Sequence, residues 1–215
     1  MDARNEPFWV NFRMDCFTST FQDLEQTEKF DNSKAYYLKT LKNIINHINK
    51  LLQKAYQLEE NLINAVFDMD TAVINKFLRD YQYGWLPNKD FLLSKIDNGE
   101  LKENKIEEIL PVVYTNLQTV SAGLELIIEY EKHEEFETLK SYLRAVLCEI
   151  YTALMDCQLT LPENVTRSIV PPEIRGMIKI PETKFRNWII FKNFIDTLNC
   201  ITDVFLRFLS NISDE

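Results

Sequence analysis

The stretch KFRNWIIFKNFIDTLNCITDVFLRFLSN, residues 184–211, carries apolar residues at every third or fourth position. This spacing places them along one face of an α-helix. A face this apolar needs neighbouring helices to cover it. The sequence therefore predicts that the last helix, about 184–212, lies in a helical core. The predicted core positions are Phe191, Phe194, Leu198, Ile201, Phe205 and Phe208.

The same period recurs in three earlier segments, at about 34–66, 104–132 and 135–158. Only His133 and Glu134 separate the second and third of these helices, so the two must be antiparallel. The other two connections are long enough to return the chain along a whole helix. We therefore expect one all-α domain, 1–215, with an up-up-down-down long-chain four-helix bundle and two long crossover loops.

Three local features add detail to this expectation. A helical spacing over about 8–28 predicts an extra N-terminal helical segment packed on the bundle, and Thr71–Tyr81 predicts a short helix in the first crossover. Pro111 either occupies the first turn of the second helix or kinks it. Thr183 is the expected cap of the last helix, with Pro181 just outside it.

Composition limits the class of function. The chain has 215 residues and a net charge of −9, which disfavours nucleic acid as a partner. The polar start and the lack of any long apolar run predict neither a signal peptide nor membrane insertion. The chain is thus expected to be cytosolic, or a mature secreted chain that has lost its signal.

Residue types that carry chemistry are sparse. The two histidines, His47 and His133, lack the Glu-x-x-His spacing of di-iron bundles. Neither a zinc-type cysteine pair nor a glycine-rich phosphate loop occurs. We therefore expect a binding protein rather than an enzyme, with no metal and no cofactor.

Cysteines and sequons bear on the compartment. Cys16, Cys148, Cys157 and Cys200 permit two disulfides in three pairings, or four reduced thiols. Asn164 and Asn211 begin two sequons, which are glycosylation candidates only on the secretory route.

Two helix surfaces look unusual for an acidic protein. The back of the third helix carries one charge in six residues, so the N-terminal segment, a disulfide partner or another protein should cover it. The first helix presents a polar face with few acids, explained by solvation or by binding. On the third helix these residues are Ser141, Arg144, Ala145, Cys148, Thr152 and Met155. On the first helix they include Lys50 and Lys54.

The start of the last helix is a third candidate surface. The helical period leaves Phe185 on its back and Trp188 on its flank. The surrounding 167–192 segment, which includes Lys184, Arg186 and Lys192, has six basic and two acidic residues. Aromatic residues beside arginine are common interface anchors, although a hydrophobic staple beneath the loop would explain Phe185 equally well.

These residues resemble the long-chain helical cytokines of the interleukin-six class. Residues 49–61, NKLLQKAYQLEEN, are similar to the first helix of the interleukin-twelve alpha chain. Residues 185–211 are similar to the last helix of several members, among them ciliary neurotrophic factor and leukaemia inhibitory factor. Residues 170–199 resemble the corresponding part of insect Unpaired ligands.

The resemblance implies a secreted ligand that clusters class I cytokine receptor chains of the shared signal-transducer type and triggers JAK/STAT signalling. For an Unpaired-type ligand the receptor would be Domeless-like. One implied contact uses the first and third helices at Lys50, Lys54, Arg144, Ala145, Thr152 and Met155. Another uses the start of the last helix at Lys184, Phe185, Arg186, Trp188 and Lys192, where Trp188 stands in place of the lysine of the family's Phe-x-x-Lys motif.

The alternative interpretation is an intracellular helical scaffold or adaptor, of which a viral or parasite effector is one version. Its thiols would be reduced, and the weakly charged strip of the third helix would meet a partner helix. Disulfide formation and glycosylation distinguish the two interpretations.

Overall fold

The computed structural model describes residues 6–10, 16, 34–67, 81–102 and 105–213. Within these residues the secondary structure is entirely helical. The four long helices are α1 (Lys34–Phe67), α4 (Ile106–Glu131), α5 (Glu134–Asp156) and α7 (Ile180–Ser213). The shorter elements are α3 (Phe91–Asp97), the 3-10 helix η2 (Arg167–Ile169) and α6 (Pro172–Arg175).

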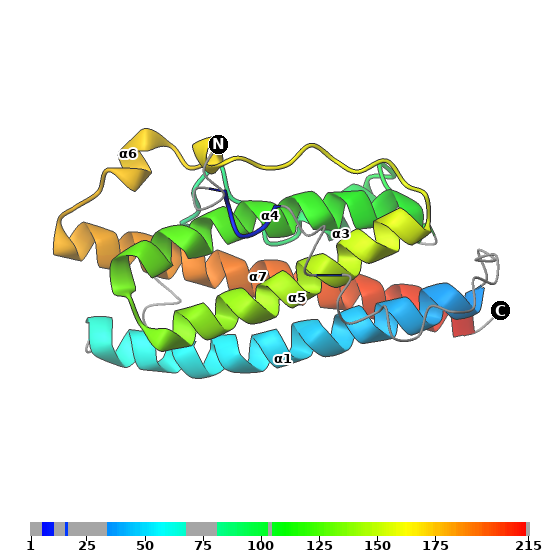
Figure 1. The fold of residues 1–215 in the computed structure, drawn as a ribbon, viewed down its shortest axis with the longest axis horizontal. Helices are drawn as coiled ribbons and strands as arrows, with labels where there is room; N and C mark the ends of the chain where they lie inside the picture. Colours follow the sequence, from blue (N-terminus) through cyan, green and yellow to red (C-terminus); the bar gives the residue numbers. More distant parts are fainter. Residues whose placement is uncertain (1–5, 11–15, 17–33, 68–80, 103–104, 214–215) are drawn as a thin grey trace.

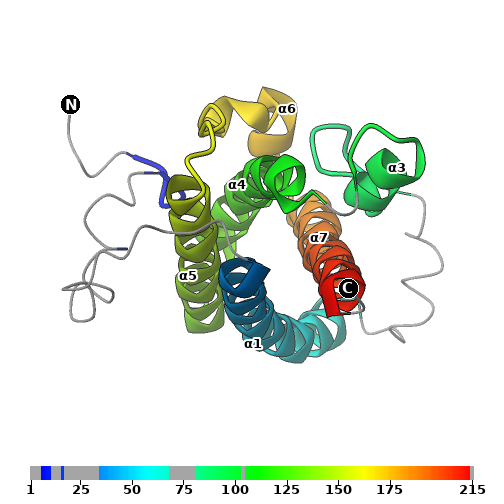
Figure 2. The same ribbon diagram turned by 90° about the vertical axis from the view of Figure 1, so that its right-hand side faces the viewer.

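The long helices form a ring around one core (Figures 1 and 2). α1 packs against α5 and α7, and α4 packs against the same two helices. α1 and α4 are therefore diagonally opposite in the ring. The four segments predicted from the helical period are confirmed as helices, with ends that shift by a few residues.

Contacts between neighbouring helices give their relative directions. Between α1 and α5, Tyr36 donates to Asp156 at one end, and Leu58 and Glu135 line the same hollow at the other. The register therefore runs antiparallel. The turn between α4 and α5 reverses the chain within two residues, with Lys132 in the left-handed region at a φ of 49°. The short connection predicted from the sequence is confirmed.

α7 is antiparallel to both of its neighbours. On α4, Gly123 faces Ile190, and Glu131, eight residues later, accepts a hydrogen bond from Asn187. Colours in Figure 1 show α1 and α7 running in opposite senses along their shared boundary. The side chains predicted to form the core of α7 are all buried, namely Phe191, Phe194, Leu198, Ile201, Phe205 and Phe208.

α4 is buried around most of its circumference, including positions that carry polar side chains. The Thr119 and Ser121 hydroxyls donate to carbonyls one turn back in their own helix. Buried Gln118 donates to Asn164 and accepts from the backbone N–H of Val165. These bonds remove the cost of unsatisfied buried polar groups. Other segments of the chain can therefore pack against the outer side of α4 as well.

The third connection, 157–179, supplies that cover by running along α4 (Figures 1 and 2). Arg167 clamps Glu125 of α4 with two hydrogen bonds, Nε to Oε2 at 2.6 Å and Nη2 to Oε1 at 2.7 Å. Such bidentate pairs are stronger than single ion pairs. The crossover is thus fastened to α4.

Two local predictions were wrong, both at the start of α7. α7 begins at Ile180, so Pro181 lies inside its first turn, where its missing N–H has no partner to lose. Thr183 donates back to the carbonyl of Lys179 instead of capping the helix. Pro111 lies inside α4 beyond its first turn, so the first-turn option is excluded.

The N-terminal segment differs from the predicted helix where it is described. Residues 6–10 form turns and a bend, and Cys16 lies in a bend. Trp9 is fully buried, and its Nε1 donates to the carbonyl of Val165 at 2.8 Å. The remainder of the predicted 8–28 segment, like residues 71–80 of the predicted short helix, lies outside the described residues.

Candidate interaction surfaces

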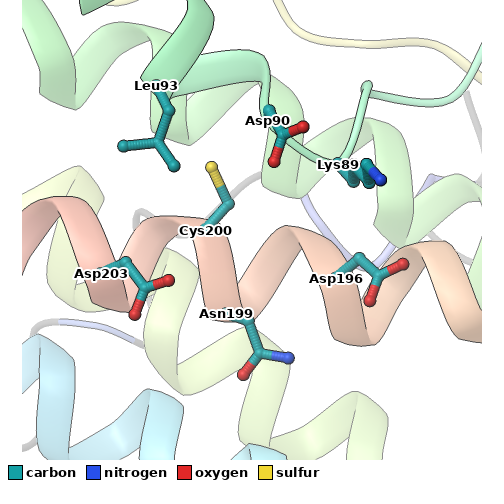
Figure 3. A pocket seen from close by; sticks show the side chains of 7 residues that line it. All are labelled: Lys89, Asp90, Leu93, Asp196, Asn199, Cys200 and Asp203. Carbon is teal, nitrogen blue, oxygen red and sulfur yellow. The ribbon is translucent and has the colours of Figure 1, made fainter.

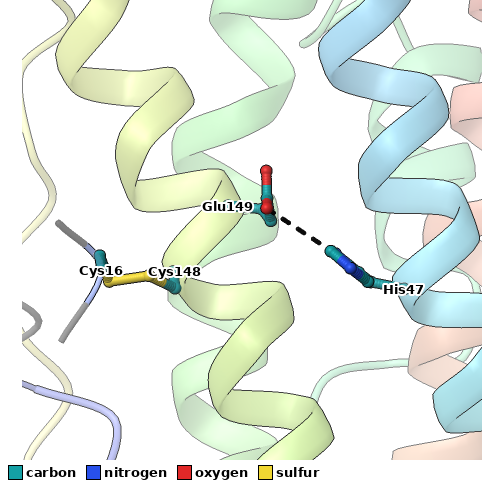
Figure 4. Close-up of a disulfide and its surroundings, with 4 residues drawn as sticks. All are labelled: Cys16, His47, Cys148 and Glu149. Atoms are coloured by element: carbon teal, nitrogen blue, oxygen red, sulfur yellow. Dashed lines mark ion pairs between the residues drawn. A yellow bond between two sulfur atoms is a disulfide. The ribbon is translucent and has the colours of Figure 1, made fainter. Parts of the chain in front are cut away.

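A disulfide joins Cys16 to Cys148 on the outer side of α5 (Figure 4). Cys157 and Cys200 are free. The sequence left three pairings open, and the structure contains one bridge. The bridge places Cys16 against the weakly charged strip of α5. Intramolecular cover, one of the explanations considered for this strip, is therefore confirmed at Cys148.

The rest of the strip is unevenly covered. Arg144, Ala145 and Thr152 are half-buried, whereas Met155 is 48% exposed near the end of α5. Phe8, in the N-terminal segment, stacks under the ammonium group of Lys140 on α5, with Nζ 5.6 Å from the ring centroid. The N-terminal segment thus packs on α5 at more than one place.

α1 meets α5 along a polar seam next to this strip. Glu149 points toward His47 of α1, with Oε1 3.9 Å from Nδ1, a distance too long for a hydrogen bond (Figure 4). Burial raises the pKa of the Tyr36 phenol, whose hydroxyl donates to Asp156. Lys50 and Lys54 are exposed on α1 beside the seam. We call Lys50, Lys54, Arg144, Ala145, Thr152 and Met155 the α1–α5 surface.

The first turns of α7 are buried more deeply than the helical period predicts. Arg186 is 0% exposed and Trp188 is 2% exposed. Their predicted place on an outward-facing surface is therefore wrong. The reason is that Ile174 of the third connection, Tyr81 of the first crossover and Glu131 of α4 all contact this end of α7, which widens its buried arc.

Arg186 forms the centre of a buried cluster that ties these elements together. Its guanidinium lies 4.9 Å from the centroid of the Tyr130 ring and donates to the backbone carbonyl of Ile174. It also donates to Asn187, which donates to Glu131 at 2.7 Å. Desolvation lowers the pKa of Arg186 from its usual high value. The residue therefore has a structural role.

Phe185 and its charged neighbours lie closer to the surface. Phe185 is half-buried and makes an edge contact with exposed Tyr81, with ring centroids 5.4 Å apart. Lys184 and Lys192 are also half-buried, and Lys192 pairs with Asp196 on its own helix. Phe185 thus packs on Tyr81 of the first crossover without becoming fully buried.

The local excess of basic residues predicted from the sequence is reduced by pairing. Arg175 lies 3.7 Å from Glu129 of α4, and Lys179 lies 3.4 Å from Glu182. Arg167 is paired with Glu125, as described above. Acids from α4, distant in sequence, therefore offset the charge of the 167–192 segment.

An exposed apolar patch remains at this end of the bundle. Ile178 is 78% exposed and Ile180 is 68% exposed, and both flank the start of α7. Tyr130 is 41% exposed and donates to the carbonyl of Ile178 at 3.1 Å, which anchors the patch. We call Tyr130, Ile178, Ile180, Lys184 and Phe185 the α7-end surface. The helical period did not reveal Ile178 and Ile180, because both precede the predicted last helix, 184–212.

A shallow hollow of about 160 Å³ lies between α3 and α7 (Figure 3). Burial raises the pKa of the Cys200 thiol at its base, so the thiol stays protonated near neutral pH. A reactive cysteine needs the opposite shift. The hollow therefore lacks an activated nucleophile. Its lining residues are Lys89, Asp90, Leu93, Asp196, Asn199, Cys200 and Asp203.

The two sequons lie in different local structures. Asn164 is exposed in the irregular stretch 159–166, whereas Asn211 is exposed in the last turn of α7. Among the described residues, no helix combines the length and hydropathy needed to cross a membrane.

Comparisons with protein-family models, with curated proteins and with solved structures find no match for this chain.

Proposed function

We propose that this protein is a secreted long-chain helical cytokine with the up-up-down-down topology of the interleukin-six class. The observation that carries the proposal is the arrangement of α1, α4, α5 and α7. Neighbouring helices are antiparallel, and their connections are long, short and long. The Cys16–Cys148 disulfide supports an oxidising compartment.

The proposed activity is to cluster class I cytokine receptor chains of the shared signal-transducer type, or a Domeless-like receptor, and so trigger JAK/STAT signalling. The α1–α5 surface and the α7-end surface are the proposed contacts. They replace a contact through Arg186 and Trp188, because those side chains are buried. Exposed apolar side chains such as Ile178 and Ile180 suit a protein partner.

The proposed mechanism is bivalent. Docking of one receptor chain confines the second encounter to the membrane plane and raises its effective concentration. A rigid bundle suits this role because it holds two separate surfaces at a constant distance and angle. The buried cluster around Arg186 holds the α7-end surface in place through Tyr130 and Ile174.

Receptor binding and signalling together test the proposal. The purified chain is applied to immobilised ectodomains of class I cytokine receptors, including a Domeless-type ectodomain, and STAT phosphorylation is measured in cells that carry them. We expect saturable binding to at least one ectodomain, and a STAT signal. A folded, disulfide-bonded chain that binds none of them would contradict the proposal.

One observation favours the second candidate, an intracellular helical scaffold or adaptor. Cys157 and Cys200 are both unpaired, which is common in reducing compartments. Non-reducing peptide mass spectrometry of the chain from its natural source separates the candidates. A Cys16–Cys148 cross-linked peptide supports the cytokine, whereas four free thiols support the scaffold.

A further inference from the structure

Asn164 is exposed and lies outside any helix. It begins the sequon Asn164-Val165-Thr166 in an exposed, irregular stretch of the third connection. Sequons that carry glycans in secreted proteins belong to surface loops. Asn211, the other candidate, is held in the last turn of α7. Local structure therefore favours Asn164.

The two side-chain atoms of Asn164 have different surroundings. Its Oδ1 accepts a hydrogen bond from Nε2 of fully buried Gln118 at 3.3 Å. The adjacent backbone N–H of Val165 donates to Oε1 of the same glutamine at 2.8 Å. The carbonyl side of the Asn164 amide is thus anchored on α4. Its Nδ2, the atom to which a glycan is attached, takes no part in this hydrogen bond.

We infer that Asn164 is an N-glycosylation site. In the reaction, Nδ2 forms a bond to the anomeric carbon of a lipid-pyrophosphate-linked oligosaccharide. The bond from that carbon to the pyrophosphate oxygen breaks, the lipid pyrophosphate leaves, and the amide loses one proton. Oδ1 takes no part in the new bond, so its hydrogen bond from Gln118 survives. The inference rests on the proposed secreted function, because the donor is met only on the secretory route.

The position of Asn164 also separates the glycan from the proposed receptor contacts on α1. The third connection runs over α4, diagonally across the ring from α1 (Figure 2). Lys50 and Lys54 therefore lie on the other side of the bundle. The glycan would leave the α1 part of the α1–α5 surface open.

The test uses the full chain secreted from animal cells behind a cleavable signal. Peptide N-glycosidase converts each glycosylated asparagine to aspartate, and peptide mass spectrometry locates the converted residue. We expect conversion at Asn164 and a loss of glycan mass in Thr166→Ala. Thr166→Ser is the matched control, because it preserves the sequon and should keep the glycan.

A secreted wild-type chain with no conversion at Asn164 overturns the inference, whether or not Asn211 is converted. Receptor binding by the same material distinguishes this failure from failure of the proposed function. A chain that binds a receptor but lacks the Asn164 glycan contradicts only the glycosylation site. A glycosylated chain that binds no receptor ectodomain contradicts only the cytokine.

Discussion

α4 and α1 lie diagonally opposite each other in the ring, yet their outer sides have different surroundings. The third connection covers α4, whose buried polar residues are satisfied by hydrogen bonds. α1 keeps a solvent-exposed polar back that includes Lys50 and Lys54. The difference shows that the crossovers divide the bundle into a covered side and an open side. A partner protein has access to the open side.

Removing the Cys16–Cys148 disulfide should lower the unfolding free energy most, because it releases the N-terminal segment from α5. We expect the double variant Cys16→Ser with Cys148→Ser to lose about 2–4 kcal/mol of unfolding free energy, the usual range for a disulfide that closes a long loop. The bridge spans 132 residues. Chemical denaturation followed by circular dichroism measures the change.

The control for this variant is Cys157→Ser, which removes a half-buried thiol that is not bridged. It should cost far less than the double variant. Equal losses in the two would show that the bridge contributes no more than an ordinary thiol.

The close packing of α4 against α7 gives the next largest effect. A Cβ at Gly123 would come within 2.6 Å of Cγ2 of Ile190 and within 3.2 Å of the Trp85 ring. Overpacking costs about 1–3 kcal/mol, and alanine recovers about 1 kcal/mol through helix propensity. Gly123→Ala should therefore lower the unfolding free energy by up to about 2 kcal/mol, measured by urea denaturation.

Gly84→Ala is the matched control, since a Cβ there has no heavy atom within 4 Å. It should be close to neutral. A Gly123→Ala variant as stable as Gly84→Ala would mean that α4 packs less closely on Ile190 and Trp85 than described.

Alkaline pH should weaken the packing around Tyr114 of α4. Burial raises the pKa of Tyr114 on α4 to about 12. Its stabilising contribution is complete below the unfolded pKa of about 10 and is lost as pH rises through the folded pKa. By pH 11 the loss should reach about 1 kcal/mol. Tyr114→Phe should show a smaller fall in unfolding free energy between pH 9 and 11, and an equal fall would contradict the shift.

The open side should tolerate substitution with the smallest change in stability. Lys50→Ala with Lys54→Ala removes two exposed lysines of α1 and should alter the unfolding free energy by less than about 0.5 kcal/mol. Under the proposed function the same variant should bind receptor ectodomains more weakly. A matched change on the covered side, Glu163→Ala, should leave binding unchanged. Wild-type binding by the lysine variant would remove α1 from the proposed contact.

Much of the fold was predictable because helical period and connection length are local properties. The four helices and the two-residue reversal between α4 and α5 agree with the sequence-based expectation. The helical period wrongly predicted that Trp188 lies on the flank of α7, because it assumes one narrow buried arc along the whole helix. Trp188 is in fact buried. Packing around Arg186 widens that arc at one end. Side chains from α4 and the third connection create this packing.

The candidate surfaces were predictable only in part for a similar reason. Lys50, Lys54 and Met155 are exposed as expected. The exposed isoleucines at 178 and 180 were not predicted, because both precede the segment, 184–212, in which the helical period was recognised. Nothing in the helical period marks Gln118, which is fully buried. Its role became visible only beside Asn164 and Val165.

The sequence by itself determined where the four long helices form and where the chain reverses between α4 and α5, because backbone geometry turns the spacing of apolar residues into a face. Only the tertiary structure decided which faces are covered, which cysteines pair and which side chains at the start of α7 remain exposed. Those outcomes depend on contacts between segments far apart in the chain, such as Cys16 with Cys148 and Trp9 with Val165. Local periodicity contains no information about such distant neighbours.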